Sequence, residues 1–369
     1  MLSILLNNMN DANELISFIA SMSGEGNLRV EENLGEGYVR LRVSEAERRQ
    51  AKHDIQHVED IVIEMLRNAR DAGADKVYLA TTKEDGVRTL VFLDNGSGVP
   101  QDMQERIFDA RVTSKLESMK LDRWGVHGRG MALFSIKQNT DEARVVASDV
   151  DLGSVFKVSV ATDRLGERAD QSSWPQAVKD EDGHYVCARG PHNIIRAACE
   201  FALEELRACD VYLGSPSEIA ATLHAQASSR LDASRLLFID DDAELPVVDR
   251  LGLASDAEDF IRICSGLGLE MSERTAHRIL AGQIKPVRGV TARLLRERDS
   301  SSHASAPVDL AKDRRGLRVA KDDMAQFSRA VERDFNDLAS RYYLNLCGDP
   351  KIRVSRDRIT VTFDLAKEE

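Results

Sequence analysis

The spacing of apolar residues predicts one helix followed by several short strands. From Val58 to Ala69, apolar side chains recur three and four positions apart, which is typical of a helix with one buried face. The β-rich runs Val77–Ala80 and Thr89–Leu93 flank a short polar segment and predict a hairpin. Val145–Ala147 and Val155–Ala161 predict the strands that complete the sheet. This order predicts an α/β fold, a two-layer sandwich with helices on one face.

The N-terminal segment predicts two further elements. Asn10–Ser23 has the pattern of a capped amphipathic helix, and Leu28–Val43 that of a hairpin turning at Gly35–Gly37. This region either forms a strap to a second subunit or packs under its own sheet.

Beyond about Arg189 the pattern becomes mainly helical. A short strand is predicted at Leu236–Ile239, and the predicted helices are Ile194–Leu206, Pro216–Ala227, Ala257–Leu267, Ser272–Leu280 and Val290–Arg296. The helix that begins at Ser272 follows a Gly-containing turn, so it belongs either to a helix-turn-helix-like unit or to ordinary helix packing.

A Ser-rich stretch, Asp299–Pro307, predicts a linker. After it, Lys321–Leu346 predicts one long amphipathic helix, and Ile352–Val354 with Ile359–Phe363 a closing hairpin. The sequence therefore divides into an N-terminal helix and hairpin, a sandwich domain, a mainly helical domain, a linker, and a terminal helix with a hairpin. The corresponding residues are 1–44, 45–188, 189–298, 299–308 and 309–369.

Three polar residues lie on one side of the helix predicted from Val58 onward. Glu64, Asn68 and Asp71 stand four and three residues apart, which places them on one helix face. Oxygen atoms arranged in this way either face solvent or hold a hard cation such as Mg²⁺ together with water and phosphate. In the second case Glu64 is placed to accept a proton from an attacking water.

Two glycine-containing segments follow. Asp94 ends a predicted strand, and Gly96 and Gly98 come directly after it, which is typical of a turn or of a close approach by a flat ligand. An Asp in this position can accept a hydrogen bond from an exocyclic amine. The glycine-rich loop that opens an apolar helix, where free backbone N–H groups bind phosphate, consists of Gly125, Val126, His127, Gly128, Arg129, Gly130 and Met131.

The order and spacing of these three motifs resemble those of the GHKL ATPases. This superfamily includes the MutL mismatch-repair proteins, DNA gyrase B subunits, type IIB topoisomerase B subunits, a heat-shock chaperone and the histidine kinases. The resemblance covers roughly residues 45 to 165 and implies the Bergerat-type ATP-binding fold. It implies that Glu64 is the general base, that Asn68 coordinates Mg²⁺ and that Asp94 binds the adenine amino group. It further implies that Gly96 and Gly98 line the adenine side and that Gly125–Met131 forms a lid over the phosphates.

Two further segments resemble GHKL motifs. Arg111–Lys115 is similar to the R-x-x-T-S-K segment of MutL-type proteins, so the resemblance implies that Thr113, Ser114 and Lys115 contact the lid or the phosphates. Gly153–Phe156 is similar to a G-T-x-F segment, with Ser154 in place of the usual Thr. The change keeps a hydroxyl group at this position.

Composition predicts a soluble cytoplasmic protein without a membrane span or a signal peptide. The cysteines are scattered, odd in number and without C-x-x-C spacing, which predicts reduced core thiols. The formal charge of −12 argues against a chain that coats nucleic acid. Basic residues do gather in one region, which is either a solvated helix face or a DNA-binding patch: Arg288, Arg293, Arg296, Arg298, Lys312, Arg314, Arg315 and Arg318.

The sequence is therefore interpreted as an ATP-driven switch. In this hypothesis Mg·ATP binds, the lid closes, subunits or domains rearrange as a homodimer forms, and Glu64 activates water for attack on the γ-phosphate. Two alternatives remain: a non-hydrolysing nucleotide sensor or scaffold that gates a protein partner, and a subunit that acts on DNA. Nothing in the sequence names a client.

Overall fold

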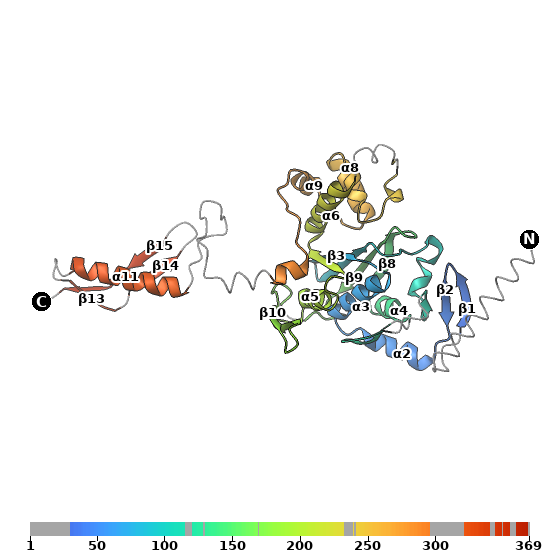
Figure 1. Ribbon diagram of the computed structural model, residues 1–369, viewed down its shortest axis with the longest axis horizontal. Helices are drawn as coiled ribbons and strands as arrows, with labels where there is room; N and C mark the ends of the chain where they lie inside the picture. Colours follow the sequence, from blue (N-terminus) through green and yellow to red (C-terminus); the bar gives the residue numbers. More distant parts are fainter. Residues whose placement is uncertain are drawn as a thin grey trace, which may run out of the picture. The chain divides into compact units, whose positions relative to one another are not determined.

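The computed structural model describes ten segments of the chain, and the statements below refer to them. They are residues 30–114, 120–127, 130–168, 170–231, 239, 241–295, 321–339, 344–348, 350–354 and 359–367. The chain divides into two compact units, Met1–Asp299 and Ser300–Glu369 (Figure 1). The predicted helix Asn10–Ser23, most of the predicted strand Leu236–Ile239 and the predicted linker lie outside the described residues.

The first unit is built on a five-stranded mixed sheet with the strand order β12-β3-β4-β9-β8. Its strands are β3 (Lys76–Glu84), β4 (Val87–Asp94), β8 (Glu142–Ser148), β9 (Ser154–Ala161) and β12 (Asp210–Gly214). The predicted β3–β4 hairpin is confirmed: its turn residues Asp85 and Gly86 both have positive φ, 47° and 80°, as a tight two-residue hairpin turn requires. The edge strand β12, which pattern analysis missed, pairs in parallel with β3.

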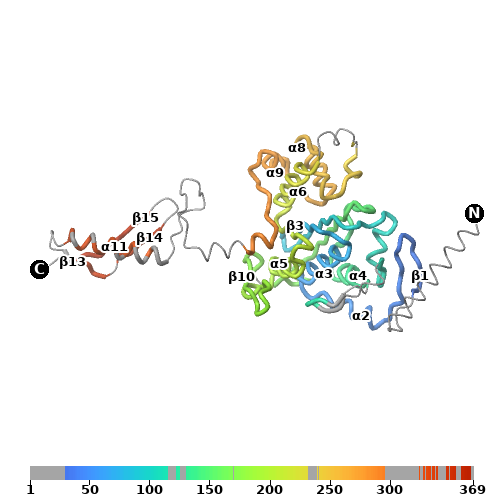
Figure 2. Tube along the Cα trace, in the orientation of Figure 1, coloured from blue at the N-terminus to red at the C-terminus, as the bar shows by residue number. Residues whose placement is uncertain are grey.

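Both faces of this sheet are apolar and buried. Along β3, Val77 and Leu79 belong to one hydrophobic core, and Tyr78 and Ala80 belong to another. The same alternation continues in β4 and β9, because successive residues of a strand point to opposite faces. Helices α3 (Val58–Asp71), α4 (Ala132–Asn139) and α5 (Ile194–Glu204) cover the first face; α6 (Pro216–Arg230), α8 (Ala257–Gly266) and α9 (Glu273–Leu280) cover the second (Figures 1 and 2).

The predicted α/β sandwich is confirmed, but the expectation that helices cover only one face is wrong. Helices from the segment predicted to be mainly helical form a further layer on the second face, packing against Tyr78, Val91, Leu93 and Val155. The sequences of the central strands β3 and β4 contain the reason, because their apolar runs Val77–Ala80 and Leu90–Leu93 are continuous, which is typical of strands buried on both sides.

Local capping fixes where the helices begin and end. In α3, the Asp60 carboxylate accepts the backbone N–H groups of Gln56 and His57 at 2.9 Å each. Gly73, with φ +75°, follows the last turn of α3 in the left-handed conformation that favours glycine. The predicted cap at Ser272 is present, since its side chain accepts the N–H of Thr275 at the start of α9.

The predicted N-terminal hairpin is also present. Strands β1 (Val30–Gly35) and β2 (Tyr38–Leu41) pair in antiparallel fashion, and β2 pairs in turn with β5 (Val112–Thr113) of the same chain. The Leu41 N–H donates to the Arg111 carbonyl oxygen at 3.0 Å. The hairpin therefore packs on its own subunit in this structure.

The first unit contains several smaller elements. They are α2 (Glu45–Asp54), η1 (Gln101–Met103), η2 (Arg106–Phe108), β6 (Lys120–Asp122), β7 (Gly125–His127), β10 (Gln176–Lys179), β11 (Tyr185–Arg189), η3 (Asp242–Glu244), η4 (Arg250–Leu253) and a helix over 290–295. None of the helices in the described segments is both long enough and apolar enough to cross a membrane.

The described residues of the second unit form one long helix and two pairs of strands. Helix α11 (Lys321–Ala339) is shorter than predicted, because Leu344–Leu346 forms strand β13 and pairs with β16 (Leu365–Lys367). The predicted hairpin is confirmed as β14 (Lys351–Val354) and β15 (Ile359–Thr362). The rings of Phe335 and Phe363 stack with centroids 4.0 Å apart, which connects the helix to the strands.

The prediction of core thiols is confirmed for four cysteines and wrong for the fifth. Cys187, Cys199, Cys209 and Cys264 are free and buried, whereas Cys347 is free and exposed.

Candidate functional site

Many of the predicted site residues line one cavity of about 590 Å³ in the first unit. This volume suits a small-molecule ligand. The predicted site residues that line it are Glu64, Asn68, Asp71, Asp94, Gly98, Thr113, Ser114, Gly130, Met131 and Ser154. They come from α3, from the ends of β4 and β9, and from the segments on either side of the β6–β7 hairpin.

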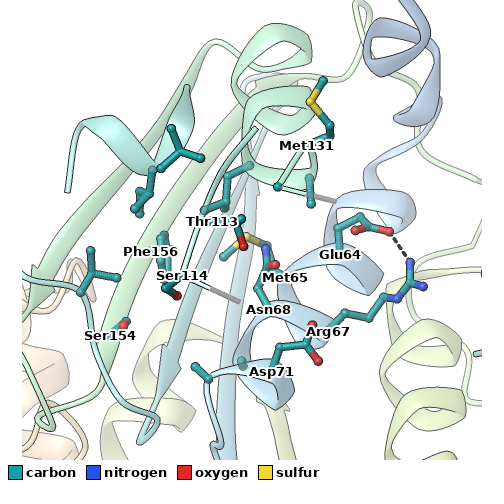
Figure 3. A pocket seen from close by; sticks show the side chains of 18 of the residues that line it. Glu64, Met65, Arg67, Asn68, Asp71, Thr113, Ser114, Met131, Ser154 and Phe156 are labelled. Atoms are coloured by element: carbon teal, nitrogen blue, oxygen red, sulfur yellow. Dashed lines mark hydrogen bonds and ion pairs between the residues drawn. The ribbon is translucent and has the colours of Figure 1, made fainter. Parts of the chain in front are cut away.

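Helix α3 supplies the polar side of the cavity. Glu64, Asn68 and Asp71 project from the same side of the helix (Figure 3), as their spacing predicts. The amide nitrogen of Asn68 is buried and has no hydrogen-bond partner among the described residues. A buried amide without a partner is costly in a folded protein, so this group is suited to a ligand that completes its contacts.

A chain of ion pairs lies behind these residues, and sequence analysis missed it. Arg67 Nη1 donates to Glu64 Oε1 at 2.6 Å, and its Nε and Nη2 donate to the two carboxylate oxygens of Asp122 at 2.8 and 2.7 Å. Arg70 donates to Asp71 at 3.0 Å and to Asp122 and Glu205 at 3.2 Å each. Burial by itself would lower the pKa of Arg70, but these acceptors raise it above its ordinary value.

Asp94 and Ser154 lie at the deep end of the cavity. They are register partners on β4 and β9, and both are almost fully buried, at 4% and 3% exposed. One Asp94 carboxylate oxygen accepts the N–H of Gly96 at 2.8 Å. Ser148, which sequence analysis missed, donates its hydroxyl to the Gly153 carbonyl oxygen and accepts the Val99 N–H, both at 2.8 Å. These bonds hold the loop after β4 against the β8–β9 turn.

The two glycines after Asp94 are required by the packing of the chain against itself. A Cβ atom on Gly98, whose φ is +72°, would lie 1.8 Å from the Asp149 carbonyl oxygen. A Cβ atom on Gly96 would lie 2.8 Å from the Ala72 carbonyl oxygen. Gly98 lines the cavity, whereas Gly96 is not among its lining residues.

The predicted glycine loop is partly a strand. Gly125, Val126 and His127, which belong to the predicted glycine-rich loop, form strand β7 and pair with β6. Gly130, with φ +66°, accepts the Arg111 N–H at 2.8 Å, and α4 begins at Ala132 with Met131 as its N-cap. Lys115, Gly128 and Arg129 lie outside the described residues.

Apolar and aromatic residues form the remaining wall, and most of them were not predicted as site residues. They include Tyr38, Met65, Phe92, Ile107, Trp124, Leu133 and Phe156. Phe92 and Phe156 are register partners on β4 and β9, two residues from Asp94 and Ser154. Residues two apart in a strand point to the same face, so the spacing of Phe92 from Asp94 and of Phe156 from Ser154 could have predicted that both rings face the site. Burial raises the pKa of the Tyr38 hydroxyl, and its hydrogen bond with Ser114 partly opposes this shift.

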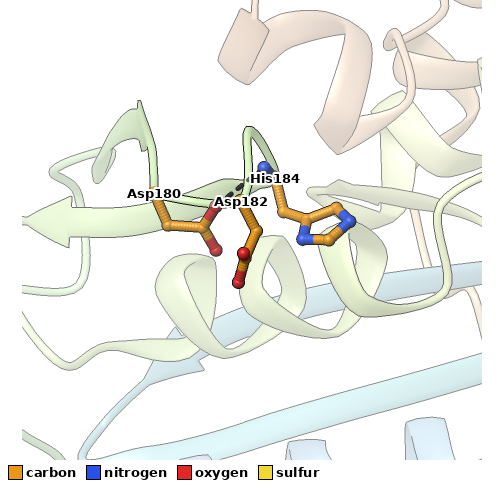
Figure 4. A group of neighbouring side chains, drawn as sticks. All are labelled: Asp180, Asp182 and His184. Atoms are coloured by element: carbon orange, nitrogen blue, oxygen red, sulfur yellow. Dashed lines mark hydrogen bonds between the residues drawn. The ribbon is translucent and has the colours of Figure 1, made fainter.

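A separate group of polar side chains lies at the turn between β10 and β11. Asp180, Asp182 and His184 are exposed, and one potential ligand atom from each lies within 4.8 Å of the others (Figure 4). The His184 N–H donates to Asp180 Oδ1 at 2.8 Å, which is a local turn contact.

Residues 55–148 match the family described as "Histidine kinase-, DNA gyrase B-, and HSP90-like ATPase". The matched segment runs from α3 through β3, β4 and α4 to β8, and it contains Glu64, Asn68 and Asp94. With the mixed α/β fold, this match shows that the chain carries an ATPase domain of the GHKL superfamily.

The chain is also similar to DNA mismatch repair proteins. The chain is 28% identical over 136 residues to the DNA mismatch repair protein MutL of Staphylococcus aureus strain Newman. The MutL proteins of strains JH1 and N315 match to the same extent. The match covers 34% of this chain and 20% of each relative, so the similarity spans about a fifth of their length.

Proposed function

We propose that this protein binds Mg·ATP in the cavity beside α3 and hydrolyses it, and that the nucleotide switches its conformation or its association. The observation that carries the proposal is the convergence of Glu64, Asn68 and Asp94 on a single cavity. Two of these residues lie on a helix and one at the end of a strand, so only the folded chain brings them together.

The α3 side of the cavity fits a divalent cation and phosphates. The carboxylates of Glu64 and Asp71 and the amide oxygen of Asn68 are the kind of oxygen ligands that Mg²⁺ prefers. The Asn68 amide nitrogen, which is buried and has no partner among the described residues, is suited to donate a hydrogen bond to a phosphate oxygen. A bound Mg²⁺ supplies neutralisation of the phosphate charge. Asn68 holds the ion through its amide oxygen, and Glu64 accepts the proton of the attacking water.

The deep end of the cavity fits an adenine base. A buried carboxylate such as that of Asp94 accepts a hydrogen bond from an exocyclic amine, and the Ser154 hydroxyl lies beside it. Met65, Phe92 and Phe156 supply an apolar wall for a flat ring. Thr113, Ser114, Lys115 and the segment Gly125–Met131 close over the phosphates in this proposal.

The first experiment is Mg²⁺-dependent ATP hydrolysis by the purified protein over a series of protein concentrations, with Glu64→Ala as the control. We expect turnover in the wild-type protein, a large loss in Glu64→Ala and unchanged ATP binding. Specific activity that rises with protein concentration supports a homodimer as the active form. ATP binding without turnover in either protein would favour a nucleotide sensor that gates a protein partner.

A role on DNA is the second candidate, and the similarity to MutL favours it. The net charge of −12 requires such binding to use a local basic surface. Retention of duplex DNA that weakens steeply with salt and changes with ATP would support this role. The absence of retention at low salt would argue against it.

A further inference from the structure

The general-base candidate Glu64 is one end of a buried chain of charges that leads to the hairpin before α4. Arg67 lies next in this chain, and its side chain is only 3% exposed. Asp122 follows at 6% exposed, and it belongs to β6 of the β6–β7 hairpin. Arg70 then connects Asp122 to Asp71, which also lines the cavity.

The geometry around Arg67 is specific for a guanidinium group. Its Nε and Nη2 meet both oxygens of Asp122, and the remaining Nη1 meets Glu64. A planar guanidinium presents its donors in a fixed fork, so the position of Asp122 sets the plane of Arg67 and therefore the direction of Nη1. A lysine carries the same charge but has no such fork.

Glu64 stays accessible from the cavity although Arg67 donates to its carboxylate. Glu64 retains a side chain that is 21% exposed and lines the cavity, so the contact with Arg67 does not seal it from a reactant.

We infer that Arg67 is a positioning residue for Glu64, and that Asp122 ties this positioning to the β6–β7 hairpin. The inference rests on the proposed ATPase function. A general base must be held within a fraction of an ångström of its working position, and side chains locked by buried hydrogen bonds achieve this. Movement of the hairpin that carries Asp122 therefore changes the orientation of Arg67 and, through it, of Glu64.

The test is the steady-state hydrolysis of Mg·ATP by the full chain and five variants. Arg67→Met removes the charge and the fork, Arg67→Lys keeps the charge, and Asp122→Asn keeps the shape but weakens the hold on Arg67. The fourth, Arg262→Met, is a matched control, because Arg262 on α8 is 59% exposed and pairs with Asp242 on the other face of the sheet. Glu64→Gln reports the turnover that depends on the base.

We expect kcat to fall about 10- to 100-fold in Arg67→Met with KM changed by less than about twofold, because a misplaced base slows the chemical step and leaves binding intact. Arg67→Lys recovers part of this loss, Asp122→Asn shows a smaller fall in kcat at constant KM, and Arg262→Met behaves as wild type. If Arg67→Met does not fold, Arg67→Lys and Asp122→Asn decide by the same criterion.

Three outcomes would overturn the inference. A kcat that is unchanged or raised in the Arg67 and Asp122 variants, while Glu64→Gln abolishes turnover, would refute the positioning role alone. A parallel change in KM and kcat with a loss of ATP binding would assign these residues to the general structure of the site. No wild-type turnover would refute the proposed hydrolysis, and the positioning role with it.

Discussion

The two faces of the main sheet use the same strands for different purposes. On one face, Phe92 and Phe156 lie two residues from Asp94 and Ser154, which stand at the strand ends, and all four side chains line the cavity. On the other face, Leu93 and Val155 at the same strand ends are fully buried under α6, α8 and α9. Neighbouring residues of one strand therefore face either the candidate site or the packed core on the other side of the sheet.

The comparison shows why polar residues are found at the strand ends on one face only. A buried carboxylate such as Asp94 needs compensating contacts, and the Gly96 N–H supplies one of them while the side chain lines an open cavity. On the second face, Leu93 and Val155 are fully buried, and apolar side chains complete the core around them.

The largest expected effect comes from the packed face. Phe260 on α8 is fully buried and contacts the ring of His224 with centroids 5.5 Å apart. Phe260→Ala should lower the free energy of unfolding by about 3 to 5 kcal/mol through lost burial and the cavity left behind. Chemical denaturation measures this, and kcat measured below the unfolding transition should remain that of wild type. A specific loss of kcat in the folded variant would break the separation between the two faces.

On the cavity face, Asn68→Ala should act on the metal and leave the fold intact. The amide nitrogen of Asn68 has no partner among the described residues, so its removal breaks no hydrogen bond there. We expect Mg²⁺-dependent ATP affinity to fall by about 100-fold, with the free energy of unfolding nearly unchanged. Titration calorimetry with and without Mg²⁺ measures this. Equal loss of affinity in both conditions would show that Asn68 does not act through the ion.

Asp94→Asn should have a smaller effect, confined to base recognition. The amide keeps an acceptor for the Gly96 N–H, so the loop conformation is retained, but its neutral oxygen is a weaker acceptor for an exocyclic amine. We expect ATP affinity to fall about tenfold. Competition by nucleotides with different bases measures the effect, and undiminished preference for adenine would place the base elsewhere.

The smallest expected difference between the two faces is in the reactivity of their buried thiols, Cys209 and Cys264. Burial raises the pKa of Cys209, in the core of the cavity face, and of Cys264, in the core of the second face, each to about 12. Because a raised pKa keeps a thiol protonated until the pH approaches it, neither forms a reactive thiolate at pH 8. Labelling followed by mass spectrometry should modify the exposed Cys347 first. Rapid labelling of Cys209 alone would reveal that the cavity face opens in solution.

Local patterns were sufficient for much of the cavity face. The period of α3 predicted that Glu64, Asn68 and Asp71 share one side of a helix, and all three line the cavity. The β3–β4 hairpin follows from turn residues that tolerate positive φ. In both cases the interacting residues are close in the sequence, so helix and turn geometry alone relates them.

Only the tertiary structure shows the ion pairs and strand pairs between residues that are distant in the sequence. The pairing of Arg67 with Asp122 spans 55 positions, and that of Arg70 with Glu205 spans 135. Neither has a local signature, because each charge is typical of a solvated surface until folding buries it beside its partner. The parallel pairing of β12 with β3 and the pairing of β13 with β16 likewise depend on partners that are distant in the sequence. The sequence by itself determined the helix face and the turns that carry the candidate chemistry, whereas only the folded chain determined which charges hold Glu64 in place, because burial is a property of the packed molecule.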